Sequence, residues 1–458
     1  MTSPDRERLT AALQEGVSAP VLTSLEARRA YSSNFGGMVC KMPALVVRTA
    51  SEEEVTHVLR LARQAQCSVA IRGSGHSFGA HGLCAGGIVV LNQAGREEIR
   101  MLNQDLVEVS SRTSWGALEQ WLNRHGRAMP VLTNELGVSV GGTLSVGGYG
   151  EGTVAHYGQI DLVVRMKLIL PDGSSVWCSA TENSELFRYG LGSLGQLGFI
   201  EKVVLRTLPY HPRSHIFIYT FPDLLALVNA TLWLAESDEP IDFFSGQHYQ
   251  SCFVATYGRR ASGRDAASEA APPGGAQLGT ARAQVAMDWP LRSLREERRT
   301  RWDPEHCFVW ADYTVSLDHL ERFVSFLTQN VLGDAAYQRY NGRTLMLALR
   351  RPERKTHFPF EPITPAMSGI ALGFGVYFKV PRAEPEGLRR VQGLQRRALE
   401  QCLRCGGRPY LAGWYEFDAG LMRQLYGESY DTLLRLRAEL DPGGRFNSTM
   451  LGPEESQQ

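Results

Sequence analysis

Apolar and polar positions near the start of the chain follow strand and helix periods in turn. Pro43–Arg48 is a short apolar run that predicts a strand, and Ser51–Glu54 after it is typical of a helix N-terminus. The next apolar positions recur at helical spacing and would share one face: Val55, Val58, Leu59 and Ala62. A second apolar run, Cys67–Ile71, leads directly into the glycine-containing loop Arg72–Ser77. This order of strand, helix, strand and glycine loop is typical of a site where backbone N–H groups bind phosphate.

Similar runs continue to about Pro209 and predict a mixed α/β block after a helical lead-in over residues 1–40. The further predicted strands of this block are Ile88–Leu91, Val107–Val109, Leu162–Leu170, Val176–Cys178 and Glu201–Leu205. The further predicted helices are Ser114–Asn123 and Asn183–Phe187.

The middle of the chain has longer strand-like runs and longer helical patterns. Strands are predicted at His215–Phe221, Cys307–Val315 and Gly373–Val380, and helices at Asp318–Leu332 and Glu386–Cys405. Two stretches lack periodicity and are predicted surface loops: Arg259–Gln284 and Arg351–Met367. A last helix is predicted at Tyr430–Leu440. The pattern favours an α+β protein whose second part is an antiparallel sheet flanked by helices.

Composition is that of a globular protein of more than one domain. The chain has 458 residues, with 43% hydrophobic and 21% charged residues, which is too long for one ordinary core. A formal net charge of zero argues against a partner that is nucleic acid or an anionic membrane. No apolar stretch is long enough for a transmembrane helix, and the polar N-terminus lacks a signal-peptide core, so we expect a cytoplasmic protein.

Eight cysteines are scattered along the chain, and reduced thiols are expected in the cytoplasm. Cys402 and Cys405 form a CxxC pair, but a zinc site needs a second pair of ligands and none lies nearby in the sequence. We therefore expect no metal.

Two glycine-rich segments carry the candidate chemistry. Residues 70–79 read AIRGSGHSFG, and residues 137–152 read GVSVGGTLSVGGYGEG, with seven glycines in sixteen positions. Glycine allows positive φ and a close approach of backbone to a ligand, so the two segments predict two walls around one large, flat or anionic cofactor. A tight bend or bulged hairpin is the structural alternative for the second segment. A hydrogen-bonded loop histidine is the alternative for His76.

The first segment does not fit a nicotinamide-binding Rossmann domain. That fingerprint requires GxGxxG at the start of a helix. Here Gly73 and Gly75 are followed by Gly79, one residue late, and the sequence after it does not start a helix.

Five motifs in order resemble one family. RGSGHS, GVSVGGTLSVGG, HYGQIDLV, ENSELF and LGSLGQLGFI look like the FAD domain of the vanillyl-alcohol oxidase and p-cresol methylhydroxylase superfamily of FAD-linked oxidases. The motifs look most like those of cytokinin dehydrogenases. The resemblance covers roughly residues 40–208, with a weaker similarity in GRPYLAGWY and DPGGRFN near the C-terminus. It implies a two-subdomain, PCMH-type FAD-binding domain.

The resemblance also assigns residues to the cofactor. His76 occupies the position where the family attaches the flavin 8α carbon covalently. Arg72, Gly73, Ser74, Gly75 and Ser77 would contact the pyrophosphate. The other cofactor-binding residues would be Asn134, Ser139, Gly141, Gly142, Thr143, Ser145, Tyr149, Ile200, Tyr410 and Asn447.

Two departures from the family bear on the chemistry. Residues 131–139 contain no cysteine, so a second covalent link to the flavin is excluded. Asn134 stands where cytokinin dehydrogenases have the aspartate that acts as catalytic base, and an amide cannot accept a proton near neutral pH. Glu135 is expected to point the other way on an extended segment. The remaining candidates for a base are Tyr410, Tyr415, His156 and His248, each with structural packing as its alternative role.

The sequence thus predicts an FAD-binding domain at 1–210 with its core at 40–208, a substrate domain at 211–404, and a C-terminal segment at 405–458 that returns to the FAD domain. We expect an FAD-dependent oxidoreductase that oxidises a C–H bond next to oxygen or nitrogen in a small, specialised metabolite, with O₂ or another compound as electron acceptor. Two alternatives stay open. One is an NADPH-dependent reductase with noncovalent FAD, like the cell-wall enolpyruvyl reductases of the superfamily, and the other is a flavin-dependent isomerase or cyclase without net redox.

Overall fold

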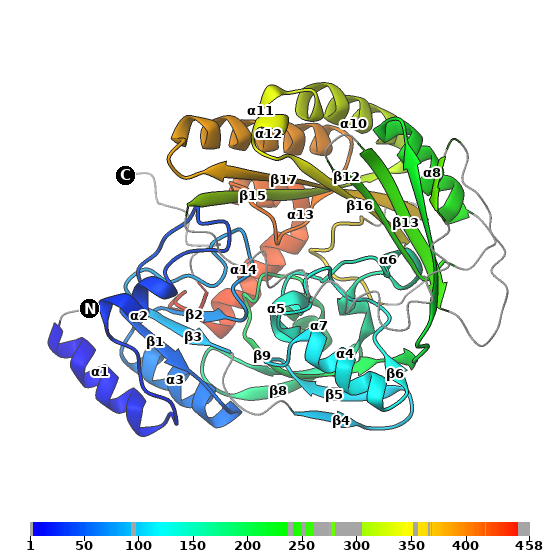
Figure 1. Cartoon of the computed structure of the whole chain (residues 1–458). Helices are drawn as coiled ribbons and strands as arrows, with labels where there is room; N and C mark the ends of the chain where they lie inside the picture. Colours follow the sequence, from blue (N-terminus) through cyan, green and yellow to red (C-terminus); the bar gives the residue numbers. More distant parts are fainter. Residues whose placement is uncertain are drawn as a thin grey trace.

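The first layer of the fold is a small parallel sheet. The computed structural model describes residues 3–92, 98–236, 241–249, 252–260, 274, 276–279, 305–350, 356–364, 367, 369–416 and 418–447. Strands β1 (Leu45–Arg48), β3 (Ile88–Leu91) and β2 (Val69–Arg72) pair in that order, all parallel. Helices α1 (Ser3–Glu15) and α3 (Glu52–Gln64) share one buried cluster with this sheet, and α2 (Leu25–Ala30) lies nearby (Figure 1).

Helix α3 shows why the local pattern predicts this layer well. Ser51 accepts a hydrogen bond from the backbone N–H of Glu54 at 3.3 Å, which caps the helix. The buried residues of α3 are those at helical spacing in the sequence: Val55, Val58, Leu59 and Ala62.

The second layer is a five-stranded antiparallel sheet in the order β4 (Ile99–Met101), β5 (Leu106–Ser110), β9 (Phe199–Arg206), β7 (Val163–Ile169) and β8 (Ser175–Ser179). Its other elements are α4 (Trp115–Arg124), β6 (Arg127–Ala128), α5 (Val140–Leu144), α6 (Thr153–His156), η1 (Gln159–Leu162), α7 (Ser184–Gly190) and β10 (Leu208–Pro209), and β6 pairs with β10. The glycine-rich segment around α5 contributes buried residues to the same apolar cluster as α4 and β9.

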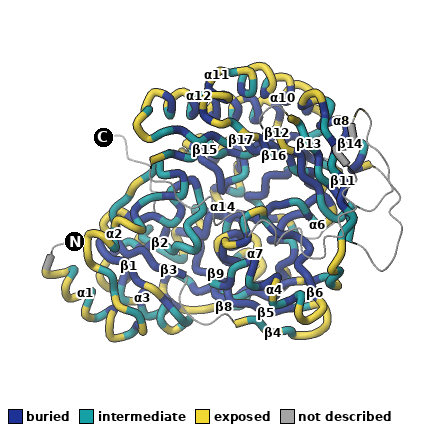
Figure 2. Tube along the Cα trace, in the orientation of Figure 1, coloured by how far each residue is buried: buried dark blue, intermediate teal, exposed yellow. Residues whose placement is uncertain are grey.

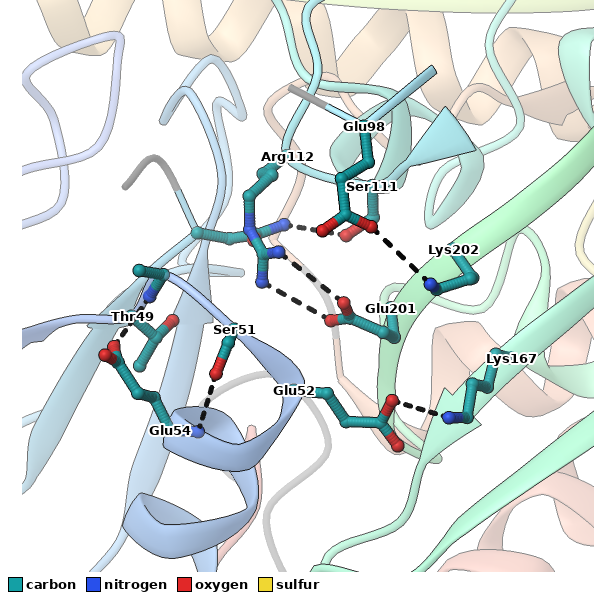
Figure 3. Close-up of polar contacts among 12 residues, drawn as sticks. Thr49, Ser51, Glu52, Glu54, Glu98, Ser111, Arg112, Lys167, Glu201 and Lys202 are labelled. Atoms are coloured by element: carbon teal, nitrogen blue, oxygen red, sulfur yellow. Dashed lines mark hydrogen bonds and ion pairs between the residues drawn. The ribbon is translucent and has the colours of Figure 1, made fainter. Parts of the chain in front are cut away.

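Among the polar contacts in Figure 3, the pair of Arg112 and Glu201 lies within the second layer, and the pair of Lys167 and Glu52 joins it to the first. The Nη2 of Arg112 lies 3.4 Å from the Oε2 of Glu201, and each side chain is only 4% exposed. Burial raises the pKa of Glu201, and the guanidinium of Arg112 opposes that rise. Lys167 on β7 also pairs with Glu52 of α3 at 2.5 Å. The parallel and antiparallel sheets are therefore held together by charge as well as by packing.

The third layer is an eight-stranded antiparallel sheet in the order β14-β11-β13-β12-β16-β17-β15-β18. The strands are β11 (Ser214–Phe221), β12 (Phe243–Tyr249), β13 (Cys252–Arg260), β14 (Ala276–Gly279), β15 (His306–Ser316), β16 (Arg343–Arg350), β17 (Ile370–Pro381) and β18 (Arg408–Pro409).

Helices cover the outer face of this large sheet, and its other face is turned toward the two smaller sheets (Figure 1). The covering elements are α8 (Leu224–Glu236), the run of η2 (Leu317–His319), α10 (Leu320–Leu327) and η3 (Thr328–Leu332), α11 (Ala335–Arg339) and α12 (Pro385–Arg404). These helices are exposed on their outward side and buried on the side that faces the sheet (Figure 2).

The C-terminal segment crosses back between the layers. Helices α13 (Ala419–Tyr426) and α14 (Glu428–Leu440) lie between the large sheet and the first layer (Figure 1). Beyond α14, Phe446 forms a parallel bridge with Val69 of β2. The side chain of Asn447 accepts from the backbone N–H of Ile71 at 2.9 Å and donates to the backbone O of Gly195 at 2.6 Å.

The fold class is α+β, as predicted, and the predicted strands and helices named above all occur with small shifts at their ends. Two predictions of surface loops are wrong in part. Arg259 and Arg260 belong to β13 and Ala276–Gly279 forms β14, and the rest of the stretch to Gln284 lies almost wholly outside the described residues. The stretch before Met367 packs inward instead of lying on the surface, because its apolar side chains are buried: Phe358, Phe360, Ile363 and Met367.

Candidate active site

One cavity lies between the glycine-rich segments and the inner face of the large sheet. Every cofactor-binding residue predicted from the sequence lines it, from Arg72 through Asn447, although these residues come from five separate parts of the chain. The sheet contributes its own lining from β15, β16 and β17. The same space therefore touches the predicted cofactor walls and the second part of the molecule.

The two glycine-rich walls touch each other directly. Ser74 donates a hydrogen bond from Oγ to the backbone O of Gly137 at 3.1 Å. A Cβ on Gly73 would overlap Ser139 Oγ, so only glycine lets the first wall come this close to the second. Gly75 has φ of +77°, the left-handed conformation that glycine adopts without strain.

The second wall contains a short helix and not a flat strand. Helix α5 begins after Ser139, and a Cβ on Gly141 would lie 2.7 Å from Ser111 Cβ. Trp115 of α4 donates from Nε1 to Thr143 Oγ1 at 2.6 Å, which holds α5 in place. The sequence alternative of a bulged hairpin is therefore wrong for this part of the wall.

Several polar atoms that face the cavity are buried and have no hydrogen-bond partner among the described residues: Ser139 Oγ, Asn92 Oδ1 and both ring nitrogens of His81. Buried polar groups are normally paired, so unpaired atoms aimed at one space indicate a polar ligand. Burial also lowers the pKa of His81 to about 4, which keeps its ring neutral. The sequence interpretation missed His81 and Asn92, although His81 follows the first glycine motif directly.

His76 faces this cavity with a carboxylate beside it. Its ring stacks on Phe35 with centroids 4.0 Å apart, and its Nε2 lies 3.7 Å from the Oε2 of Glu135. Burial lowers the pKa of His76, and Glu135 opposes that shift.

The prediction that Glu135 points the other way is therefore wrong. The segment is not extended here: it turns at residues 136–137, and the backbone N–H of Gly137 donates to Glu135 Oε1 at 3.1 Å.

The large sheet provides the third wall, and its cavity face carries a partly buried acid. On β15 this face presents Phe308, Trp310, Asp312 and Thr314, which alternate as expected for one side of a strand. Trp310 donates from Nε1 to Asp312 Oδ1 at 2.8 Å. Burial raises the pKa of Asp312 to about 7. The sequence interpretation overlooked this acid, whose signal was a single charge inside an otherwise apolar and aromatic strand.

The structure separates the candidates for a catalytic base. Tyr410 lines the cavity, and its hydroxyl accepts from the backbone N–H of Gly148 at 3.3 Å. Tyr415 does not line the cavity, and its hydroxyl donates to the backbone O of Asp312 at 2.6 Å. His156 and His248 also lie outside it, and His248 pairs through Nδ1 with Tyr337 at 2.9 Å. Asn134 lies in the lining but is exposed.

Comparison with known proteins finds one matching domain family and several related oxidoreductases. A family model for the FAD binding domain matches residues 43–179. An uncharacterised oxidoreductase from the fasciation locus of Rhodococcoides fascians is 25% identical over 90% of this chain and 93% of its own length. Cytokinin dehydrogenase 7 of Oryza sativa subsp. japonica is 29% identical over 47% of the chain and 43% of its own length. Residues 43–179 of this chain are an FAD binding domain similar to that of the PCMH-type FAD-linked oxidases. The flavoenzyme thus spans less than half the length of the cytokinin dehydrogenases it matches.

A solved structure supports the fold over most of the chain. The 6-hydroxy-D-nicotine oxidase of Arthrobacter nicotinovorans superposes with a TM-score of 0.73, covering 94% of this chain and 96% of that chain at 17% identity. The matched domain and the relatives together support an FAD-dependent oxidase or dehydrogenase.

The lining residues fit FAD. Backbone N–H groups of the glycine walls and the unpaired polar atoms at Ser139 and Asn92 suit a pyrophosphate and ribityl chain without requiring net positive charge. In the part of the chain that the structure describes, no group of His, Cys, Asp and Glu could hold a metal ion. A search of the described helices also finds none long and apolar enough to cross a membrane.

Proposed function

We propose that the flavoenzyme carries FAD through a single covalent bond to His76 and oxidises a C–H bond next to oxygen or nitrogen in a small, specialised metabolite. Bound FAD would supply the chemistry by accepting a hydride at N5 and passing the electrons to O₂ or another acceptor. The observation that carries the proposal is the continuity of the cavity, which runs from His76 and the glycine walls to the face of the large sheet.

His76 suits attachment because it is held and kept neutral. Stacking on Phe35 fixes the plane of the ring, and burial favours the uncharged imidazole, whose free nitrogen is a nucleophile. Glu135 lies beside Nε2 and can take the proton that this nitrogen loses. Single attachment is supported by the sequence, since residues 131–139 contain no cysteine.

The far side of the cavity suits an apolar substrate. Leu345, Leu347 and Leu349 of β16 face it together with Phe308 of β15. Apolar walls of this kind bind a ring or a branched chain and keep water from the reacting bond. We also propose that the flavoenzyme works in the cytoplasm, which suits its free cysteines, and that the domains divide at residues 210 and 405.

Covalent attachment is tested by acid precipitation of the purified flavoenzyme. We expect the wild-type pellet to stay yellow and the pellet of His76→Ala to be colourless, with the exposed His319→Ala as a matched control that keeps the colour. When apoprotein is mixed with FAD, Glu135→Gln is expected to slow the appearance of yellow colour that stays in the acid-precipitated pellet. A colourless wild-type pellet would contradict the attachment.

The reaction class is tested by anaerobic mixing, with flavin absorbance as the readout. Candidate reductants are 6-hydroxy-D-nicotine, a cytokinin, benzyl alcohol, benzylamine and NADPH. Bleaching by an organic substrate supports the proposal, and bleaching by NADPH alone supports a reductase. If no compound bleaches the flavin, a non-redox role is favoured over the oxidation we propose.

A further inference from the structure

An acid lies at the centre of the apolar wall opposite the cofactor segments. Asp312 is in the middle of β15, and its neighbours on the cavity face are the aromatic ring of Trp310 and the hydroxyl of Thr314. The alternate residues of β15 point the other way into the helix-covered core, where Ala311 and Tyr313 are fully buried. A carboxylate at this position needs a reason, because apolar residues would make a more stable sheet.

The sheet makes room for this carboxylate. Asp312 pairs in register with Gly375 of β17, and a Cβ on Gly375 would overlap Asp312 Oδ1 and approach the ring of Tyr377 to 2.8 Å. The absence of a side chain at Gly375 therefore leaves the space that the acid occupies. Gly373, two residues earlier on β17, also lines the cavity.

The backbone and the side chain of Asp312 are both fixed. Its backbone N–H donates to the hydroxyl of Tyr415 at 2.9 Å, and that hydroxyl donates back to the backbone O of Asp312 at 2.6 Å. Trp310 binds Oδ1, and the indole ring of Trp310 stacks on Tyr377 with centroids 5.7 Å apart and planes at 7°. Trp310 of β15, Tyr377 of β17 and Tyr415 after β18 thus fix the position of this carboxylate in the cavity wall.

The charge environment suits a group that gains and loses a proton near neutral pH. Desolvation raises the pKa of Asp312, and the hydrogen bond from Trp310 only partly offsets that effect. The titratable groups that interact electrostatically with it are Tyr377, Tyr410, Tyr415 and Tyr313, and burial raises the pKa of each, so all four are neutral at pH 7. Among the described residues, no cation contributes to the pKa of Asp312.

The other candidates for a base are less suited. Asn134 has no proton-accepting group, and Glu135 lies beside His76 with one oxygen bound to the backbone of Gly137. The Tyr410 hydroxyl accepts from Gly148, and burial raises its pKa further above neutral.

We propose that Asp312 is the proton acceptor of the oxidation, in place of a base at position 134. The inference rests on the proposed function. In the step, the O–H or N–H bond of the substrate breaks and its proton goes to Asp312. The neighbouring C–H bond breaks, and bound FAD would take its hydrogen with both electrons, so that a C=O or C=N bond forms. Bound FAD would pass the two electrons to O₂ or another acceptor, and Asp312 releases its proton to solvent.

Ligand binding can test whether Asp312 gains and loses a proton in the cavity, even when the substrate is not identified. Benzoate and benzamide have nearly the same shape, but only benzoate carries a charge, and it stays ionised between about pH 6 and pH 9. In the wild type, the Kd of benzoate is expected to rise about tenfold per pH unit above about pH 7, since two anions then share the cavity. The Kd of benzamide should not change.

Asp312→Asn keeps the size of the side chain and an acceptor for Trp310, and it should remove the pH dependence of benzoate binding. Asp318→Asn, an exposed acid after the same strand, is the matched control and should bind like the wild type. Flavin absorbance or Trp fluorescence reports binding. A pH-independent Kd for benzoate in the wild type, or a pH dependence that Asp312→Asn retains, would overturn the proposal.

A second test measures the rate of anaerobic flavin reduction, with whichever of the candidate reductants named above bleaches the flavin. The rate of flavin reduction should rise with pH to a plateau above about pH 7 in the wild type, and Asp312→Asn should lose that rise and fall by about 10²–10⁴-fold. An amine and the matching alcohol, benzylamine and benzyl alcohol, tell which heteroatom carries the proton. If no organic compound bleaches the wild-type flavin, the proposed function fails, and the benzoate result still decides whether Asp312 titrates in the cavity.

Discussion

Replacing Asp312 by asparagine is expected to stabilise the folded protein, and to do so more at high pH than at low pH. The partly buried carboxyl has a pKa of about 7 against 3.8 for an ordinary aspartate, a difference of about 3 units. At about 1.36 kcal/mol per unit, ionised Asp312 lowers the free energy of unfolding by about 4 kcal/mol at pH 8. The asparagine variant has no charge to bury, so it should be more stable by an amount of this order.

The sign follows from which state binds the proton. Because the folded-state pKa is raised, the folded protein takes up a proton as the pH falls through 7, while the unfolded chain stays ionised until about pH 4. The advantage of Asp312→Asn should therefore shrink to about 2 kcal/mol near pH 5. Urea unfolding followed by circular dichroism at several pH values measures this, with Asp318→Asn as the control. If Asp312→Asn is no more stable than the wild type at pH 8, the carboxylate is not the desolvated charge that we infer.

Two further predictions concern the ion pair of the second layer and the glycine beside Asp312. Arg112→Leu leaves Glu201 buried without its partner and should lower the free energy of unfolding by about 3–5 kcal/mol. The double variant with Glu201→Leu should recover most of this loss in urea unfolding. If it recovers none, the single substitution removes packing and not a charge interaction. Gly375→Ala should push Asp312 aside and slow anaerobic flavin reduction by about 10²-fold, whereas Gly393→Ala, at a helix position open around its Cβ, should leave the rate unchanged and so controls for adding a methyl group.

Much of the first two layers could be predicted from local pattern. The cap at Ser51 and the buried face of α3 follow from spacing alone, because a helix period and a capping side chain are local properties. The glycine walls could be placed on one cofactor from their composition and family resemblance. The short helix α5 could not be predicted from local pattern, because it depends on a hydrogen bond from Trp115 of another helix to Thr143.

The catalytic side of the site was harder to predict. Glu135 was placed facing away because an extended chain alternates its side chains, but a turn at residues 136–137 breaks that alternation. The role of Asp312 depends on which face of β15 meets the cavity, and on the burial that raises its pKa. Both depend on the packing of the large sheet over the cofactor segments, which no short stretch of sequence specifies.

The contact of Asn447 with Ile71 has a consequence for how the protein matures. The two residues are 376 positions apart, yet their hydrogen bond closes the edge of the cofactor cavity beside β2. A ribosome must therefore synthesise the chain at least to residue 447 before this edge of the cavity can form. The complete cavity for FAD would therefore need residue 447 in place, and proteolytic loss of the segment after α14 would remove this hydrogen bond and open that edge of the cavity even where every glycine-rich residue is intact.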